Sequence, residues 1–236
     1  VWFAYNEEDW VLKNISFEVK SGKTLALVGA TGAGKSSIVN LLNRFYEINK
    51  GHIYIDGQEI KNYELSFLRK NIAVVLQDVF LLSDSIFNNI TLQNPKISRE
   101  QVYQAADLVG ASTFIERLPG GYDYDVMERG ATLSMGQRQL ISFVRALVYD
   151  PKIIILDEAT SSVDSDTEFL IQGAISKLMK GRTAIVVAHR LSTIQNADNI
   201  MVLDRGEIKE QGTHDDLLNR EGYYANLHEM QFKEVI

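Results

Sequence analysis

Short apolar runs alternate along the chain with longer stretches in which apolar residues recur every three or four positions. The apolar runs are residues 24–28, 72–76, 153–156, 184–188 and 199–203. Runs of this length are typical of buried strands, and strands that alternate with helical stretches favour a mainly parallel sheet. The pattern therefore predicts an α/β fold.

One helical stretch, residues 35–46, follows the first predicted strand closely. Its apolar residues Ile38, Leu41, Leu42 and Phe45 share one face at helical spacing. We therefore expect an amphipathic helix that packs this face against the rest of the core.

Two regions differ from this alternating pattern. Residues 1–20 alternate apolar and polar side chains at Ile15, Phe17 and Val19, which predicts antiparallel strands. Residues 86–148 are chiefly helical in pattern, so we expect a helical subdomain inserted in the α/β core. Residues 1–236 are thus predicted to form one domain with an N-terminal antiparallel β-subdomain.

Composition narrows the classes of protein to which the chain can belong. Apolar residues make up 45% of the chain, which is enough for a substantial core, and no run reaches the roughly 18 uncharged apolar residues of a membrane helix. The absence of cysteine fits a reducing compartment and excludes disulfides. A net charge of −7 disfavours nucleic-acid binding. The chain begins with Val1 rather than Met, so we interpret it as part of a longer protein.

A glycine-rich segment stands between the first predicted strand and the helix that follows it. It fits the pattern G-x-x-x-x-G-K-[ST] with the residues Gly29, Ala30, Thr31, Gly32, Ala33, Gly34, Lys35 and Ser36. Glycines let backbone N–H groups converge on phosphates, and the helix N-terminus adds positive potential. Lys35 would reach the β- and γ-phosphates, and the Ser36 hydroxyl would bind Mg²⁺. The alternative is a strand–helix turn without a ligand, for which Lys35 and Ser36 offer no advantage.

Two carboxylates, Asp157 and Glu158, follow the apolar run 153–156. The carboxyl ends of parallel strands are where α/β sheets place ligands and catalytic groups. Asp157 would hold Mg²⁺, directly or through water, and Glu158 would act as general base or orient the attacking water. The alternative is that either residue only caps the segment that follows.

A third motif, residues 133–139, reads Leu-Ser-Met-Gly-Gln-Arg-Gln and opens a helical stretch. Ser134 and Gly136 at a helix start can offer a hydroxyl and N–H groups to a second phosphate. The alternative is that Ser134 is an ordinary helix N-cap.

The three motifs together resemble those of ABC ATPases, and the resemblance covers residues 1–232. In that family the third motif is usually Leu-Ser-Gly-Gly-Gln; here Ser134, Gly136 and Gln137 match it, and Met135 replaces the first glycine. The resemblance implies a P-loop NTPase fold, Mg²⁺-dependent ATP hydrolysis, and nucleotide contacts from the phosphate loop through Ser37. Because Glu158 is present, nothing marks the chain as a non-hydrolysing copy.

Further residues match other elements of the family. Gln77 resembles the glutamine that contacts Mg²⁺ and the attacking water, and His189 resembles the switch histidine near the γ-phosphate. Residues 161–164 resemble a loop that crosses the dimer interface, and Tyr5 resembles the aromatic residue that stacks on adenine. The alternatives are that His189 is a structural hydrogen-bonding residue and that Tyr5 belongs to the core.

The resemblance also implies partners. Two copies would bind head to tail, with each ATP between the phosphate loop of one and residues 134–137 of the other. Residues 128–130 and 76–86 resemble exporter segments that touch the membrane domains, although Phe80, Leu81, Leu82, Ile86 and Phe87 could equally be core residues. The chain would then lie at the cytoplasmic face of a membrane, in a bacterium the inner membrane. A soluble ABC ATPase acting on ribosomes or nucleic acid and a regulatory module without turnover are the competing hypotheses.

Overall fold

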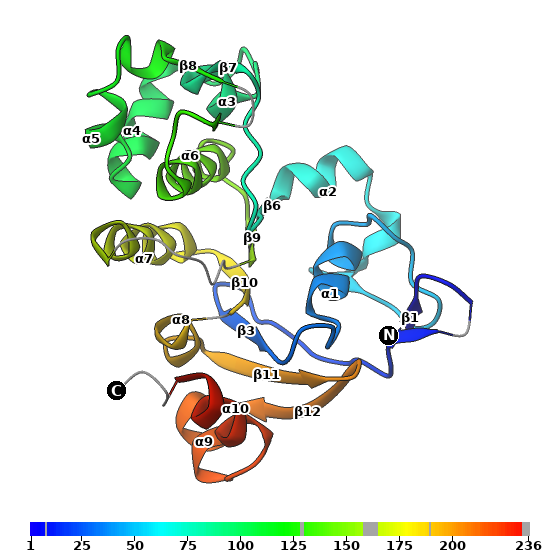
Figure 1. Ribbon diagram of the computed structural model, residues 1–236. Coiled ribbons are helices and arrows are strands. Elements are labelled where there is room, and N and C mark those ends of the chain that lie inside the picture. Colours follow the sequence, from blue (N-terminus) through cyan, green and yellow to red (C-terminus); the bar gives the residue numbers. More distant parts are fainter. Residues whose placement is uncertain (8, 128–129, 158–164, 189, 233–236) are drawn as a thin grey trace. The chain divides into compact units, whose positions relative to one another are not determined.

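The computed structural model describes residues 1–7, 9–127, 130–157, 165–188 and 190–232 (Figure 1). The chain divides into two compact units by its internal contacts. The first unit comprises Val1–Ile72, Ile153–Glu158 and Thr183–Ile236, and the second comprises Ala73–Lys152 and Ala159–Arg182.

The first unit is built on a sheet whose order differs from the order of its strands in the chain. Its strands are β3 (Thr24–Val28), β9 (Ile153–Asp157), β10 (Thr183–Val187), β11 (Asn199–Asp204) and β12 (Glu207–Gly212). They are neighbours in the order β12-β11-β3-β10-β9, and only the β11–β12 pair among them is antiparallel. The prediction of an α/β fold with a mainly parallel sheet is confirmed.

The helices of the first unit are mostly short. They are α1 (Lys35–Leu42), α2 (Leu65–Asn71), α8 (Leu191–Gln195), α9 (His214–Asn219) and α10 (Tyr223–Phe232), with a 3₁₀ turn at η1 (Ile60–Asn62). The helix predicted for residues 35–46 was too long. It ends at Leu42, because Asn43 turns its side chain back to the Val39 carbonyl and Arg44 adopts a left-handed conformation with φ 49°. Phe45 was therefore wrongly placed on the buried face, since 55% of its surface is exposed.

Two small antiparallel pairs complete the first unit. One joins β1 (Phe3–Ala4) to β2 (Trp10–Leu12), and the other joins β4 (Tyr54–Ile55) to β5 (Gln58–Glu59). The prediction of N-terminal antiparallel strands is thus confirmed for β1 and β2 and wrong for the alternating segment that follows. Ile15 is buried and Phe17 and Val19 are half-buried. Ile15 exchanges backbone hydrogen bonds with Val1, but residues 13–20 lie outside the strands of the described chain.

The second unit is chiefly helical, as the pattern of residues 86–148 predicts. Its elements are α3 (Ile86–Thr91), α4 (Arg99–Val109), α5 (Ser112–Ile115), η2 (Gly121–Asp123), α6 (Met135–Val148) and α7 (Ser165–Met179), with most of β6 (Ile72–Val75). A two-residue ladder also pairs β7 (Asp84–Ser85) with β8 (Asp125–Val126). None of the helices in the described ranges combines the length and apolar character needed to cross a bilayer.

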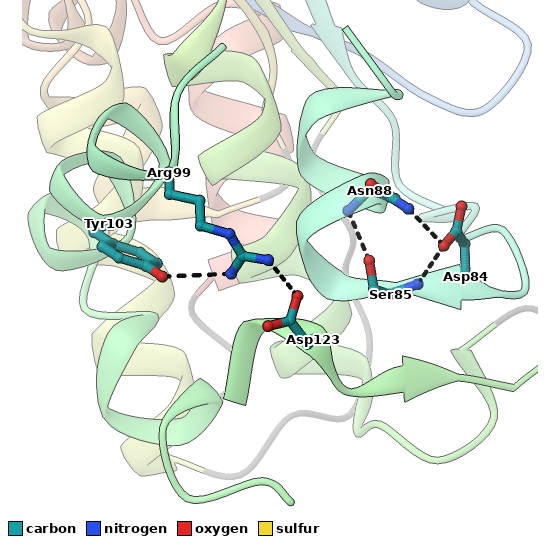
Figure 2. A network of polar contacts seen from close by, with 6 residues as sticks. All are labelled: Asp84, Ser85, Asn88, Arg99, Tyr103 and Asp123. Atoms are coloured by element: carbon teal, nitrogen blue, oxygen red, sulfur yellow. Dashed lines mark hydrogen bonds and ion pairs between the residues drawn. The ribbon is translucent and has the colours of Figure 1, made fainter. Parts of the chain in front are cut away.

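Polar contacts fix the start of α3 and the turn before β8 (Figure 2). The Ser85 hydroxyl caps α3 by accepting a bond from the Asn88 backbone N–H, and the Asp84 carboxylate accepts bonds from Ser85 N and Asn88 Nδ2. Arg99 pairs with Asp123. Hydrogen bonds from Asn88, Gln93 and the Ser85 N–H hold the pKa of the Asp84 carboxyl below its usual value.

Candidate functional site

The phosphate loop, residues 29–36, connects β3 to α1 in the first unit. Three glycines in it have positive φ values, 152° at Gly29, 82° at Gly32 and 105° at Gly34. Gly34 is the N-cap of α1 and has no side chain with which to cap it. The first N–H groups of a helix have no intrahelical partner, so the backbone of this loop can donate hydrogen bonds to an anion.

Lys35 turns back over this loop. Its ammonium donates hydrogen bonds to the carbonyl oxygens of Gly29 at 2.6 Å and Ala30 at 3.0 Å, and only 7% of the residue is exposed. Burial lowers the pKa of Lys35, and the negative charge of Asp157 opposes that shift. The positive charge is therefore held at the mouth of the loop by weak neutral acceptors, which phosphate oxygens can replace with stronger charge-assisted bonds.

Asp157 lies at the same edge of the sheet as the phosphate loop. It is the last residue of β9 and pairs with Val187 of β10, and β10 runs parallel to β3, which leads into the loop. The structure therefore brings Asp157 near Lys35, as the motif pattern predicts. Glu158 follows Asp157 and His189 follows Ala188, but both predictions, and that for residues 161–164, lie outside the described residues.

Tyr5 directly follows β1 and presents a half-exposed ring, with 45% of its surface accessible. Its ring packs edge-to-face against Phe3 at 4.7 Å and Tyr46 at 4.9 Å between centroids. Its hydroxyl lies 3.1 Å from Ser37 Oγ and accepts a bond from Asn40 Nδ2 at 3.3 Å. Tyr5 thus belongs to the surface rather than the core, and α1 holds it.

Residues 133–139 of the second unit, called here the Ser134 segment, start α6. The Ser134 hydroxyl accepts a bond from Gln137 N at 3.2 Å, and Gln137 Oε1 accepts one from Ser134 N at 2.9 Å. This is a complete capping box. The N-cap alternative is therefore correct as far as it goes, and the exposed Ser134 stays a predicted phosphate contact.

A cavity of about 550 Å³ opens on the second unit. It is lined by Gln77, Asp78, Val79, Phe80, Ala131, Met135, Arg138 and Gln139. Phe80 is 61% exposed and Leu82 is also exposed, whereas Leu81 and Ile86 are buried. The core alternative is thus correct for Leu81 and Ile86 and wrong for Phe80 and Leu82, and contact with membrane domains stays a prediction. The prediction for residues 128 and 129 lies outside the part of the chain that the structure describes.

Sequence reasoning missed two residues that hold the backbone of residues 80–82, next to this cavity. Asn89 is fully buried, and its side chain bonds both the N–H and the carbonyl of Leu82. Arg145 is half-buried and donates to the carbonyl oxygens of Asn89 at 2.8 Å and Phe80 at 3.3 Å. A polar residue inside an otherwise apolar helical pattern is the signal that could have identified both of them.

Comparison with known proteins gives consistent matches. A family described as "ABC transporter" matches residues 12–161. The chain is 51% identical, over 98% of its length, to a probable multidrug resistance ABC transporter ATP-binding/permease protein of Bacillus subtilis. It is 52% identical, also over 98%, to an ATP-dependent lipid A-core flippase of Haemophilus influenzae. It spans 34% and 40% of the lengths of these two relatives.

A solved structure agrees with the sequence matches. A bacterial Atm1-family ABC exporter with ATP bound matches all of this chain with a TM-score of 0.92 and 44% identity, over 41% of the exporter chain. The chain is therefore similar to this exporter in both fold and sequence.

Proposed function

The chain belongs to the ABC transporter family, and from that premise we propose that it is the ATP-binding and ATP-hydrolysing motor domain of an exporter. The observation that carries the proposal is the phosphate loop, in which Lys35 is buried over backbone carbonyls that phosphate oxygens can replace. The printed names of the relatives, which are ATP-binding/permease and flippase proteins, support transport as the work that the motor drives.

ATP would contact the first unit at two places. Residues 29–36 and Ser37 would bind the phosphates through backbone N–H groups and Lys35, and Tyr5 would stack on adenine. The hydrogen bond between the Tyr5 and Ser37 hydroxyls and the bond that Asn40 Nδ2 donates to the Tyr5 hydroxyl support this pair of contacts, because they join the ring to the helix that follows the phosphate loop.

Mg²⁺ fits the oxygen donors at this edge of the sheet. Ser36 is exposed at the start of α1, and the Asp157 carboxylate lies close enough to Lys35 for its charge to oppose the lowering of the lysine pKa by burial. By its resemblance to the family's glutamine, Gln77 would add an amide oxygen. Bound Mg²⁺ would neutralise phosphate charge during transfer.

Hydrolysis would use the residues that follow the parallel strands. Glu158 would accept the proton of the attacking water, Gln77 would orient that water, and His189 would contact the γ-phosphate. Lys35 would stabilise the charge that develops on the phosphate oxygens.

A second chain would complete the site. In the proposed head-to-tail dimer, Ser134, Gly136 and Gln137 of one chain would contact the nucleotide held by the phosphate loop of the other. The exposed position of Ser134 at the start of α6 supports this contact. Two copies of this chain, or this chain and a homologous one, would form two such sites.

The cavity of the second unit would receive a helix of the membrane domains. Exposed Phe80 and Met135 beside Gln77 support an apolar docking surface next to a residue of the site. ATP-driven closure of the dimer would move the membrane domains through it, at the cytoplasmic face of a membrane. The helical subdomain of about residues 86–148 would carry half of this surface, through Ala131, Met135, Arg138 and Gln139.

The hypothesis of a soluble ABC ATPase acting on nucleic acid or ribosomes is not favoured, because the relatives are transporters. A regulatory module without turnover makes a different kinetic prediction. The purified chain should release phosphate from ATP at a rate per molecule that rises with protein concentration. A chain that binds ATP without releasing phosphate at any concentration would be a regulatory module.

The Glu158→Gln variant tests the catalytic assignment. It should bind ATP normally, hydrolyse it about 10²- to 10⁴-fold more slowly, and accumulate as an ATP-bound dimer in size-exclusion chromatography. Normal turnover by this variant would mean that Glu158 is not the base.

A further inference from the structure

Two hairpin turns in the first unit have the same backbone conformation. In the β4–β5 turn, φ is 48° at Asp56 and 79° at Gly57; in the β11–β12 turn, φ is 48° at Arg205 and 79° at Gly206. Positive φ at both central residues is the type I′ geometry, which favours glycine at the second position. Turn geometry alone therefore explains both glycines equally well.

The surroundings of the two glycines differ completely. A Cβ added at Gly57 would meet no atom within 4 Å. A Cβ added at Gly206 would lie 2.1 Å from the carbonyl oxygen of Val11 and 2.9 Å from its carbonyl carbon, which no side-chain rearrangement can relieve. The β11–β12 turn is therefore pressed against the backbone of β2, whereas the β4–β5 turn is open.

Hydrogen bonds join the Gly206 backbone to two segments at once. Its N–H donates to the carbonyl of Ala33, in the middle of the phosphate loop, at 3.1 Å. Its carbonyl accepts a bond from the N–H of Lys13, just after β2, at 2.7 Å. One residue of the turn thus holds the phosphate loop on one side and the end of β2 on the other.

The phosphate loop itself shows the same close approach. A Cβ on Gly34 would lie 2.6 Å from Leu12 Cδ2, 3.3 Å from the Val11 carbonyl oxygen and 3.8 Å from the Gly206 Cα. The backbones of β2, the phosphate loop and the β11–β12 turn therefore converge at one point. β2 is also paired with β1, whose next residue is Tyr5.

We propose that Gly206 is a positioning residue for nucleotide binding. Its backbone holds the phosphate loop in place through the bond to Ala33, an arrangement called here the brace, and only glycine fits at this position. The proposal rests on the proposed function of the loop. In this proposal Gly206 itself contacts neither the nucleotide nor a metal ion. A side chain at this position must move either β2 or the loop, and a moved Ala33 changes the directions of the N–H groups that would bind phosphate.

The test compares Gly206→Ala with Gly57→Ala, which places the same side chain at the same φ without the collision. Both variants carry the strain of an alanine at positive φ, so both should melt at a lower temperature. Only Gly206→Ala should lose affinity, by about tenfold or more, which corresponds to about 1.4 kcal/mol of binding free energy. The affinities of both variants for ATP and for inorganic tripolyphosphate, which lacks the base and ribose, are measured at a temperature below the melting range of either variant.

A loss of affinity for both ligands in Gly206→Ala, with Gly57→Ala unchanged, supports the brace. Equal affinities in two folded variants would overturn it. If the unmodified chain binds neither ligand, the proposed function fails instead, so the two failures are distinguishable.

A second measurement covers the case in which Gly206→Ala does not fold. In the unmodified chain, tripolyphosphate should slow hydrogen exchange of the Gly206 amide, because that amide bonds the loop that the ligand orders, and should leave the Gly57 amide unchanged. Unaltered exchange at Gly206 in the saturated complex would overturn the proposal.

Discussion

Two helices of this chain begin at loops that are predicted to bind phosphate. They differ in whether side chains accept hydrogen bonds from their first N–H groups. α1 starts at Gly34, which has no side chain, and the residue after it is a buried lysine that rests on loop carbonyls. α6 starts at Ser134, whose hydroxyl and whose partner Gln137 close a complete capping box.

The difference separates a helix start without a side-chain cap from one that has a capping box. The start of α1 gathers positive charge and backbone donors that an anion would complete. The start of α6 depends less on a ligand, because its own side chains already accept bonds from the N–H groups of Ser134 and Gln137. We infer that the phosphate loop supplies most of the affinity for ATP and that the Ser134 segment adds a contact to a nucleotide already bound.

The largest effect should come from Lys35→Ala. Removing charge-assisted bonds to two phosphates should weaken ATP binding by about 10²-fold or more. Lys23→Ala is the matched control, since Lys23 lies at the opposite end of β3 in an exposed ion pair with Asp198. Isothermal titration of both variants measures the difference, and undiminished ATP binding by Lys35→Ala would remove the phosphate-loop assignment.

A smaller effect, on turnover rather than on initial binding, should follow Ser134→Ala. The chain offers an internal control in Ser98, which forms the same capping box with Gln101 at the start of α4. Losing either cap should cost about 1 kcal/mol of unfolding free energy. Only Ser134→Ala should also lower ATPase activity, by about tenfold.

Urea unfolding and phosphate release, measured on both serine variants, decide between the two roles. If Ser134→Ala and Ser98→Ala lose the same stability and neither loses activity, Ser134 is a cap and nothing more.

Tyr5 should contribute to binding of the adenine base and not to binding of the phosphates. Stacking of a base on an aromatic ring contributes at least about 1 kcal/mol, so Tyr5→Ala should weaken ATP binding by at least about fivefold and leave tripolyphosphate binding unchanged. Tyr5→Phe keeps the ring and loses the hydroxyl that meets Ser37. If Tyr5→Phe binds ATP as poorly as Tyr5→Ala does, the hydroxyl rather than the ring makes the contact with ATP.

The smallest effect should come from Met135→Gly, which restores the residue usual in the family. Glycine lowers helix stability by at most about 1 kcal/mol at this first helical position. Because Ser134 and Gly136 are unchanged, ATPase activity should stay within about twofold. A large gain in activity would show that Met135 limits the contact between the Ser134 segment and nucleotide.

The sequence predicted the elements that carry chemistry better than it predicted their limits. The strand that ends at Asp157 and the strand that leads into the phosphate loop were predicted correctly, because continuous apolar runs favour buried structure. The end of α1 was wrong because Phe45 continues the helical period while Arg44 turns the chain. Periodicity records side-chain spacing and not the backbone conformation that ends a helix.

The sequence could mark Asn89 and Arg145 as unusual polar residues, but it could not predict the partners of their tertiary hydrogen bonds. Asn89 and Arg145 act on the backbone of residues 80–82, and Gly206 acts on Ala33. Each of these contacts joins segments through main-chain groups, which carry no sequence of their own to read.

The central claim is that one working site takes its phosphate loop from one chain and its Ser134 segment from another. Mixing Lys35→Ala with Ser134→Ala tests it directly, because a mixed dimer contains one site in which both parts are intact. In a two-fold dimer half of the pairs are mixed and one of their two sites works, so about a quarter of the unmodified ATPase activity should return. If the mixture is no more active than the average of the two variants measured separately, each chain contains its whole site and the claim is wrong.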